Sequence, residues 1–296
     1  MYGLIRDYLR VNPMTSLAFI VFIALLYLKA KQKLDALQLY YHPKSGLVKK
    51  VVETSRLGQM VFKPSILLPN GNLQTFMNPV MGYMLKRKRE IRYERELFKM
   101  KDGGTIAIDW VDEIPHPGLK SKKPIVAIMP GLSSDNDVVY VLNLLISAKQ
   151  AGLRPVVINY RGASKVELTN ATLYCAGSVN DLRQPLEYIH AKYCGGHGDG
   201  SGEIARGEVI DLFLVGNSMG ANIVANYLGE EGAKCFVKAA VCVQPPMKMW
   251  ECGENIEKRL FGFYNYILGR SLKDKMERWA PNIREAYLAN HGIDLQ

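Results

Sequence analysis

The chain has 296 residues and a formal net charge of +10, with 38 Lys and Arg against 28 Asp and Glu. An apolar content of 48% with 22% charged residues excludes a disordered chain, and 26 Gly and 14 Pro without a period exclude a collagen-like one. The charge is unevenly distributed. Residues 1–100 hold 17 basic and 6 acidic residues, whereas residues 101–296 hold 21 basic and 22 acidic residues. The sequence thus predicts a basic first third joined to a neutral globular remainder.

Residues 11–28 (VNPMTSLAFIVFIALLYL) carry no charge and precede Lys29, Lys31 and Lys33. As a helix, 18 residues rise about 27 Å, just enough to cross a thin bilayer. A cleaved signal peptide is disfavoured because no small-x-small cleavage site follows, and a buried soluble helix because the segment lacks a polar face. We expect residues 1–35 to form a single-pass membrane anchor. The basic residues after it slightly favour a cytosolic C-terminal part, and sidedness stays open.

Residues 36–90 read as a basic connector with turn signals at His42-Pro43, Pro69-Asn70-Gly71 and Asn78-Pro79. The run Lys86-Arg87-Lys88-Arg89 fits either a solvated charge cluster or contact with anionic lipid headgroups. No aromatic stacking platform or DNA-reading motif accompanies this charge, so we expect no nucleic-acid partner.

Residues 91–296 alternate between strand and helix patterns after an initial hairpin at 91–100 and 105–112. This order predicts an α/β domain with a mostly parallel sheet and helices on both faces. The further strands are expected at 124–130, 154–160, 209–216 and 237–246, and the helices at 138–152, 179–193 and 221–232.

No metal or organic cofactor is indicated. The five cysteines are scattered, without a C-x-x-C pair or zinc-finger spacing, so we interpret them as small apolar residues or free thiols. The Gly-rich stretch 194–207 satisfies neither G-x-G-x-x-G nor G-x-x-x-x-G-K-[ST], and we assign it no phosphate-binding role.

The strongest motif is Gly216-Asn217-Ser218-Met219-Gly220, a G-x-S-x-G directly after a predicted buried strand and before a helix. So sharp a turn strains the backbone at Ser218, and a Gly on each side keeps Cβ atoms away from the neighbouring strand and helix. Ser218 Oγ is thereby held at the carboxyl edge of the sheet. The Met219 amide, at the helix N-terminus, can donate to an oxyanion there. The alternative is a serine that only caps the helix.

A second oxyanion donor is expected in the loop after strand 124–130, which reads Pro130-Gly131-Leu132-Ser133-Ser134-Asp135. The Leu132 amide is the candidate. The alternative for this loop is an ordinary Pro-Gly turn.

Four segments, GNSMGANIVANYLG, MPGLSSDNDVVYVLNLL, VVINYRGAS and TLYCAGSVNDL, together resemble the α/β-hydrolase superfamily. More narrowly, they and LLPNGNLQT (67–75) resemble the membrane-anchored α/β-hydrolase-domain lipases of its family 4 branch, over roughly residues 40–290. The resemblance implies an α/β-hydrolase fold with a helical cap at 247–278. It also implies Ser218 as nucleophile, Leu132 and Met219 as oxyanion donors, lipid esters such as acylglycerols or phospholipids as substrates, and an endomembrane location such as the endoplasmic reticulum.

The acid and base of a catalytic triad are not found. In this fold the nucleophile is followed by Asp or Glu and then His, on loops after two further strands. After strand 237–246 we find only helical sequence, and His291 and Asp294 follow no strand. We therefore expect the last two strands of the fold to be missing from this sequence. Two hypotheses stay open: a shortened form of a complete lipase, or a catalytically silent membrane-associated paralogue that binds lipid or a protein.

Overall fold

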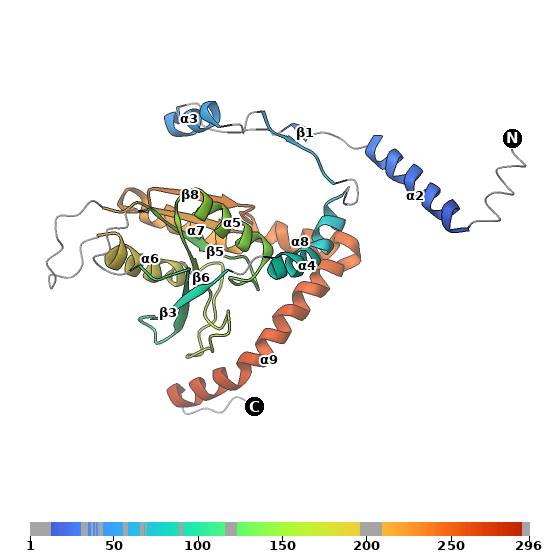
Figure 1. Cartoon of the computed structure of the whole chain (residues 1–296). Coiled ribbons are helices and arrows are strands. Elements are labelled where there is room, and N and C mark those ends of the chain that lie inside the picture. Colours follow the sequence, from blue (N-terminus) through green and yellow to red (C-terminus); the bar gives the residue numbers. More distant parts are fainter. Residues whose placement is uncertain are drawn as a thin grey trace, which may run out of the picture. The chain divides into compact units, whose positions relative to one another are not determined.

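The computed structural model describes residues 13–30, 35–36, 38, 40, 44–55, 59–65, 68, 70–88, 91–115, 123–195 and 209–291. The chain forms two compact units, Met1–Tyr83 and Met84–Gln296 (Figure 1). The boundary between the units falls inside the connector that the sequence predicted.

In the first unit, the segment predicted as an anchor is helical. The helix α2 (Pro13–Ala30) covers it from its third residue on, since residues 11 and 12 lie outside the described part of the chain. Among the residues that the structure describes, no helix has both the length and the apolar character needed to cross a membrane. The predicted transmembrane anchor at 11–28 is therefore not supported.

The connector contains more helix than its turn signals predicted. It holds α3 (Gly46–Thr54) and α4 (Gly71–Lys88). A short antiparallel pair joins β1 (Asp35–Ala36), at the start of the connector, to β2 (Val61–Phe62). Two polar side chains explain where the helices begin: the Val48 amide donates to Ser45 Oγ at 3.4 Å and the Leu73 amide to Asn70 Oδ1 at 3.0 Å. Asn70, which we interpreted as a turn residue, is thus the N-cap of α4.

The second unit is built on a six-stranded sheet of order β3-β4-β6-β5-β7-β8 (Figure 1). The pairs β3/β4 and β4/β6 are antiparallel, and the other three pairs are parallel. This confirms the predicted hairpin followed by a mostly parallel sheet. The strands are β3 (Tyr93–Lys99), β4 (Thr105–Val111), β5 (Ile125–Met129), β6 (Arg154–Ile158), β7 (Leu212–Asn217) and β8 (Ala239–Val243).

Helices cover both faces of this sheet, as predicted. The helix α5 (Val139–Gln150) packs Val141 and Leu145 on one face, against Val111 and Val126. The helices α6 (Asn180–Tyr193) and α7 (Met219–Glu231) pack on the other face, in a larger apolar cluster with Trp110. Burial of the apolar side chains in these two clusters is the main contribution to the free energy that holds the helices on the sheet.

The topology sets one place apart. From β5 the next strand, β6, lies toward the β3 edge of the sheet, whereas from β7 the next strand, β8, lies at the opposite edge. The direction in which successive strands are added therefore reverses between β5 and β7. In open α/β sheets, ligands bind outside the carboxyl ends of the strands at such a switch point. The two loops singled out in the sequence, after β5 and after β7, lie at this point.

The predicted cap is helical but extends further than expected. It consists of α8 (Met249–Lys258), the 3₁₀ turn η3 (Arg259–Gly262) and α9, which continues from Phe263 to His291. Trp250, Phe261 and Tyr266 are exposed.

Candidate active site

Ser218 occupies a strained turn between β7 and α7, with φ 53° and ψ −118°. A positive φ at a residue other than glycine costs on the order of 1–3 kcal/mol and clusters at functional sites. The Ser218 amide donates to the Val243 carbonyl of β8 at 2.9 Å. The Ser218 side chain is exposed and makes no capping bond to α7, so the helix-cap interpretation is not supported.

The two flanking glycines have no room for a side chain. A Cβ on Gly216 would lie 2.6 Å from the Gly220 carbonyl oxygen, and a Cβ on Gly220 would lie 2.6 Å from the Met129 carbonyl oxygen. Both neighbours are backbone atoms of packed elements, which cannot move aside cheaply. The close approach of α7 to β5 and β7 therefore requires glycine at both positions.

The β5–α5 loop (residues 130–138) passes directly beside Ser218. A Cβ on Gly131 would lie 3.2 Å from Ser218 Cβ and 3.2 Å from the hydroxyl oxygen of Tyr140. The Gly131 amide donates to that hydroxyl at 2.9 Å, and the Tyr160 hydroxyl donates to the Pro130 carbonyl at 2.8 Å. Burial raises the pKa of Tyr140, which stays a neutral hydroxyl at pH 7.

Of the predicted site residues, the fold brings the elbow, Gly216 to Gly220, together with the loop that carries Leu132. Leu132 is half-buried and Met219 is buried at the start of α7. Their backbone amides thus belong to the two segments that flank Ser218.

The histidines give no base in contact with Ser218 among the described residues. His190, on α6, stacks on Phe236 with ring centroids 4.2 Å apart, a packing role. His291 ends α9 and its side chain lies outside the description, as do His116 and Asp294.

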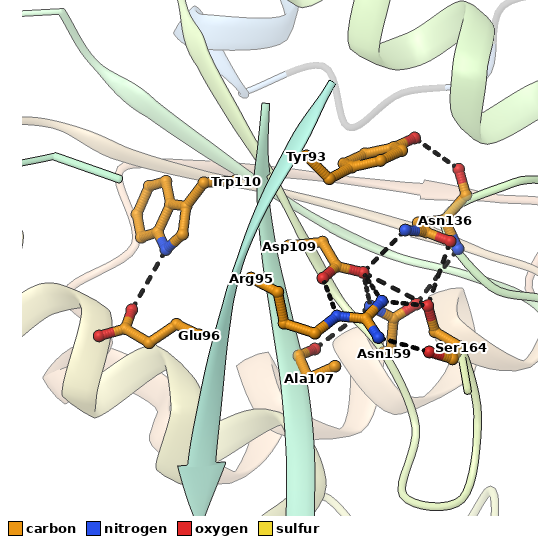
Figure 2. A network of polar contacts seen from close by, with 9 residues as sticks. All are labelled: Tyr93, Arg95, Glu96, Ala107, Asp109, Trp110, Asn136, Asn159 and Ser164. Atoms are coloured by element: carbon orange, nitrogen blue, oxygen red, sulfur yellow. Dashed lines mark hydrogen bonds and ion pairs between the residues drawn. The ribbon is translucent and has the colours of Figure 1, made fainter. Parts of the chain in front are cut away.

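A buried polar cluster that the sequence did not reveal joins β3 and β4 to the β5–α5 loop (Figure 2). Its centre is Asp109 of β4, whose side chain is fully buried. Asp109 accepts from Arg95 Nε at 2.6 Å and from the side-chain amides of Asn136 and Asn159 at 2.8 Å each. The hydrogen bond to Asp109 is also the main cause of the raised pKa of Arg95. A charged residue inside the apolar strand TIAIDWV was the signal available for this cluster.

A cavity of about 710 Å³ lies between the β5–α5 loop, the loop after β6 and α9. Ser133 and Asp135 line it from the first loop, and Lys275 and Trp279 from α9. The Trp279 indole donates to the Gly162 carbonyl at 3.0 Å. Trp279 therefore fixes α9 against the loop after β6.

This sheet order, with a strained serine at the turn from β7 into α7, defines the core of an α/β-hydrolase. No family model matches the sequence. The chain is 28% identical to a protein named phospholipase ABHD3 from Bos taurus over 220 residues, 73% of this chain and 49% of that protein. It is 23% identical to monoacylglycerol lipase ABHD2 from Homo sapiens over 290 residues, 94% of this chain and 61% of that protein.

Among solved structures, an esterase from Pyrococcus furiosus, Pf2001, aligns at 15% identity with a TM-score of 0.45, over 67% of this chain and 70% of that one. The sequence matches support the α/β-hydrolase superfamily and its lipase branch, as the motifs indicated. The chain spans about half the length of the ABHD3 relative that it matches.

Proposed function

We propose that this chain carries the nucleophile and the oxyanion-binding segments of a serine hydrolase that cleaves carboxylic esters of lipids. The observation that carries the proposal is Ser218, held exposed in a positive-φ turn with the β5–α5 loop against it. The names of the two relatives, a phospholipase and a monoacylglycerol lipase, support lipid esters as the substrate class.

In the proposed reaction, Ser218 Oγ attacks the ester carbonyl carbon and its proton passes to a base. The amides of Leu132 and Met219 donate to the oxyanion that forms, aided by the N-terminal dipole of α7. The bond to the alcohol breaks and the alcohol takes the proton. Water then hydrolyses the acyl-serine, which releases the acid and restores Ser218.

One observation favours a second candidate function, a catalytically silent protein that binds lipid or a partner. In the described residues, no hydrogen bond joins the Ser218 side chain to a His, Asp or Glu. A serine hydroxyl without a base is a weak nucleophile.

Labelling of the full chain with a fluorophosphonate separates these candidates, because the probe reacts with an activated serine. If the chain is a hydrolase, the probe should label it in membranes of cells that express it, and should not label the Ser218→Ala variant. Absence of labelling in a chain that melts cooperatively would favour the silent protein.

We further propose that the chain associates with an endomembrane, such as the endoplasmic reticulum, through α2. The support is the exposure of its large apolar side chains, among them Leu17, Phe19, Ile20 and Phe22, because exposed apolar surface of this kind favours a lipid environment. The test is sedimentation of the membranes of lysed expressing cells at neutral pH and physiological salt. The chain should stay in the pellet, and a Phe19→Ser, Ile20→Ser, Phe22→Ser variant should move to the supernatant. Release of the unaltered chain would contradict the proposal.

A further inference from the structure

Asn136 of the β5–α5 loop is held through all four of its polar groups. Its amide donates to Asn159 Oδ1 at 3.2 Å, and its carbonyl accepts from the Tyr93 hydroxyl at 2.8 Å. Its side-chain amide donates to Asp109 Oδ2 at 2.8 Å, and its side-chain oxygen accepts from Ser164 Oγ at 3.2 Å. These four hydrogen bonds restrict Asn136 to a single conformation. Asn136 therefore fixes the end of the β5–α5 loop that leads into α5.

Asp109 accepts directly from Asn136 and also bonds two of the other partners of Asn136, Asn159 and Ser164 (Figure 2). Its donors come from β3, from the β5–α5 loop and from the end of β6. A carboxylate offers two oxygens with about four acceptor positions and no donor, which matches a ring of N–H groups. An amide at position 109 would turn an N–H₂ group towards part of this ring and leave the Arg95 guanidinium without its counter-charge.

The other end of the same loop is also fixed. The Tyr160 hydroxyl holds the Pro130 carbonyl and the Tyr140 hydroxyl accepts from the Gly131 amide. The Ser134 amide donates to the Gly131 carbonyl at 3.2 Å. Leu132 lies between the two fixed ends, and a Cβ added to the neighbouring Gly131 would lie 3.2 Å from Ser218 Cβ.

We propose that Asp109, acting through Asn136, is a positioning residue that holds the β5–α5 loop so that the Leu132 amide faces the oxyanion formed at Ser218. The inference rests on the proposed function, because it assigns a task to a loop of that same site. An oxyanion donor acts through preorganisation. Loosening the loop therefore lowers kcat and the rate of serine modification and leaves KM nearly unchanged.

The structure offers a matched control in Glu96, on the opposite face of the same two strands (Figure 2). Glu96 is also a poorly exposed carboxylate that collects several donors, among them Trp110 Nε1 at 3.2 Å, Lys192 Nζ at 2.5 Å and the Tyr193 hydroxyl at 2.9 Å. Its partners lie on β4 and α6, away from the β5–α5 loop. Removing its charge disturbs stability in a comparable way without touching the loop.

The experiment compares Asp109→Asn, Asn136→Ala and Glu96→Gln in the full chain. One readout is amide hydrogen exchange of residues 131–137, which needs no activity. The other is the rate of fluorophosphonate reaction at Ser218, together with kcat and KM for a short-chain p-nitrophenyl ester. Melting temperatures of all three variants report the structural cost.

The expected result is faster exchange of the loop and a reaction rate lower by about ten- to a hundredfold in Asp109→Asn and Asn136→Ala, with KM nearly unchanged. Glu96→Gln should melt earlier and keep the unaltered chain's exchange and rate. If Asp109→Asn fails to fold, Asn136→Ala still tests the loop. Equal slowing by Glu96→Gln, or unchanged exchange in the folded loop variants, would overturn the inference. An unaltered chain without esterase activity or labelling would defeat the proposed function, while the exchange data would still decide whether the cluster fixes the loop.

Discussion

The Trp279 indole donates a hydrogen bond to the Gly162 carbonyl at 3.0 Å, which joins α9 to the loop after β6 across 117 positions of sequence. Gly162 has φ +69°, and a Cβ there would lie 2.6 Å from the indole nitrogen. Trp279 is buried and packs edge-on against Tyr174, with ring centroids 5.9 Å apart. The contact therefore depends on glycine for both backbone conformation and space.

Gly162→Ala should destabilise the chain more than Gly152→Ala, measured as free energies of unfolding in urea. Gly152 has φ +77° but nothing within 4 Å of an added methyl group, so its substitution reports the backbone strain alone, about 1 kcal/mol. The excess cost of Gly162→Ala reports displacement of Trp279. Equal costs would mean that the indole moves away freely.

Two glycines of α7 should respond to alanine with opposite signs. A Cβ on Gly220 would meet the Pro130 and Met129 carbonyls, so Gly220→Ala should strongly destabilise the fold or push the elbow out of shape. Gly229 lies in the same helix with nothing within 4 Å, so Gly229→Ala should stabilise by about 0.5–1 kcal/mol. Thermal melts of both variants check this, and a neutral Gly220→Ala would contradict the close packing of α7 on β5.

The parts of the fold that the sequence predicted are those with a short-range signal. The strand predicted at 124–130 is β5 (Ile125–Met129), and the elbow lies between β7 and α7, because apolar runs and a five-residue motif are local patterns. The helix α4 was missed because Asn70 between Pro69 and Gly71 resembles a turn, although the same side chain caps a helix.

The Asp109 cluster could not be predicted for a different reason. Its hydrogen bonds join residues from 14 to 69 positions apart, such as Arg95 with Asp109 and Arg95 with Ser164. A buried carboxylate can be suspected from its place in an apolar strand, but its partners follow only from the order of strands in the sheet. The same limit applies to Tyr140, whose bond to Gly131 depends on how α5 begins.

The buried ion pair of Arg161 should respond unequally to loss of its two partners. Arg161 donates to Asp181 at 2.8 and 2.5 Å and to Asp102 at 2.8 Å; the Asp181 side chain is 5% exposed and that of Asp102 is 40% exposed. Asp181→Asn should destabilise by about 3 kcal/mol, because it leaves a buried guanidinium without its main counter-charge. Asp102→Asn should cost clearly less, since water reaches that side chain. Urea unfolding at pH 7 measures both, and equal losses would show that Asp181 is not the dominant partner.

His190 should make stability depend on pH on the acid side of neutrality. Burial lowers its pKa in the folded chain below the ordinary 6.5, because the imidazole packs on Phe236 in its neutral form. The unfolded chain then binds the proton more readily, so this contribution is fully present above pH 6.5 and is lost as pH falls through the folded pKa. The free energy of unfolding should decrease from pH 7 to pH 5. In the His190→Phe variant the free energy of unfolding should decrease less over the same pH range. The phenylalanine keeps the stacking and removes the titration, so the difference between the two slopes isolates the imidazole. Identical slopes would assign the pH dependence to other groups.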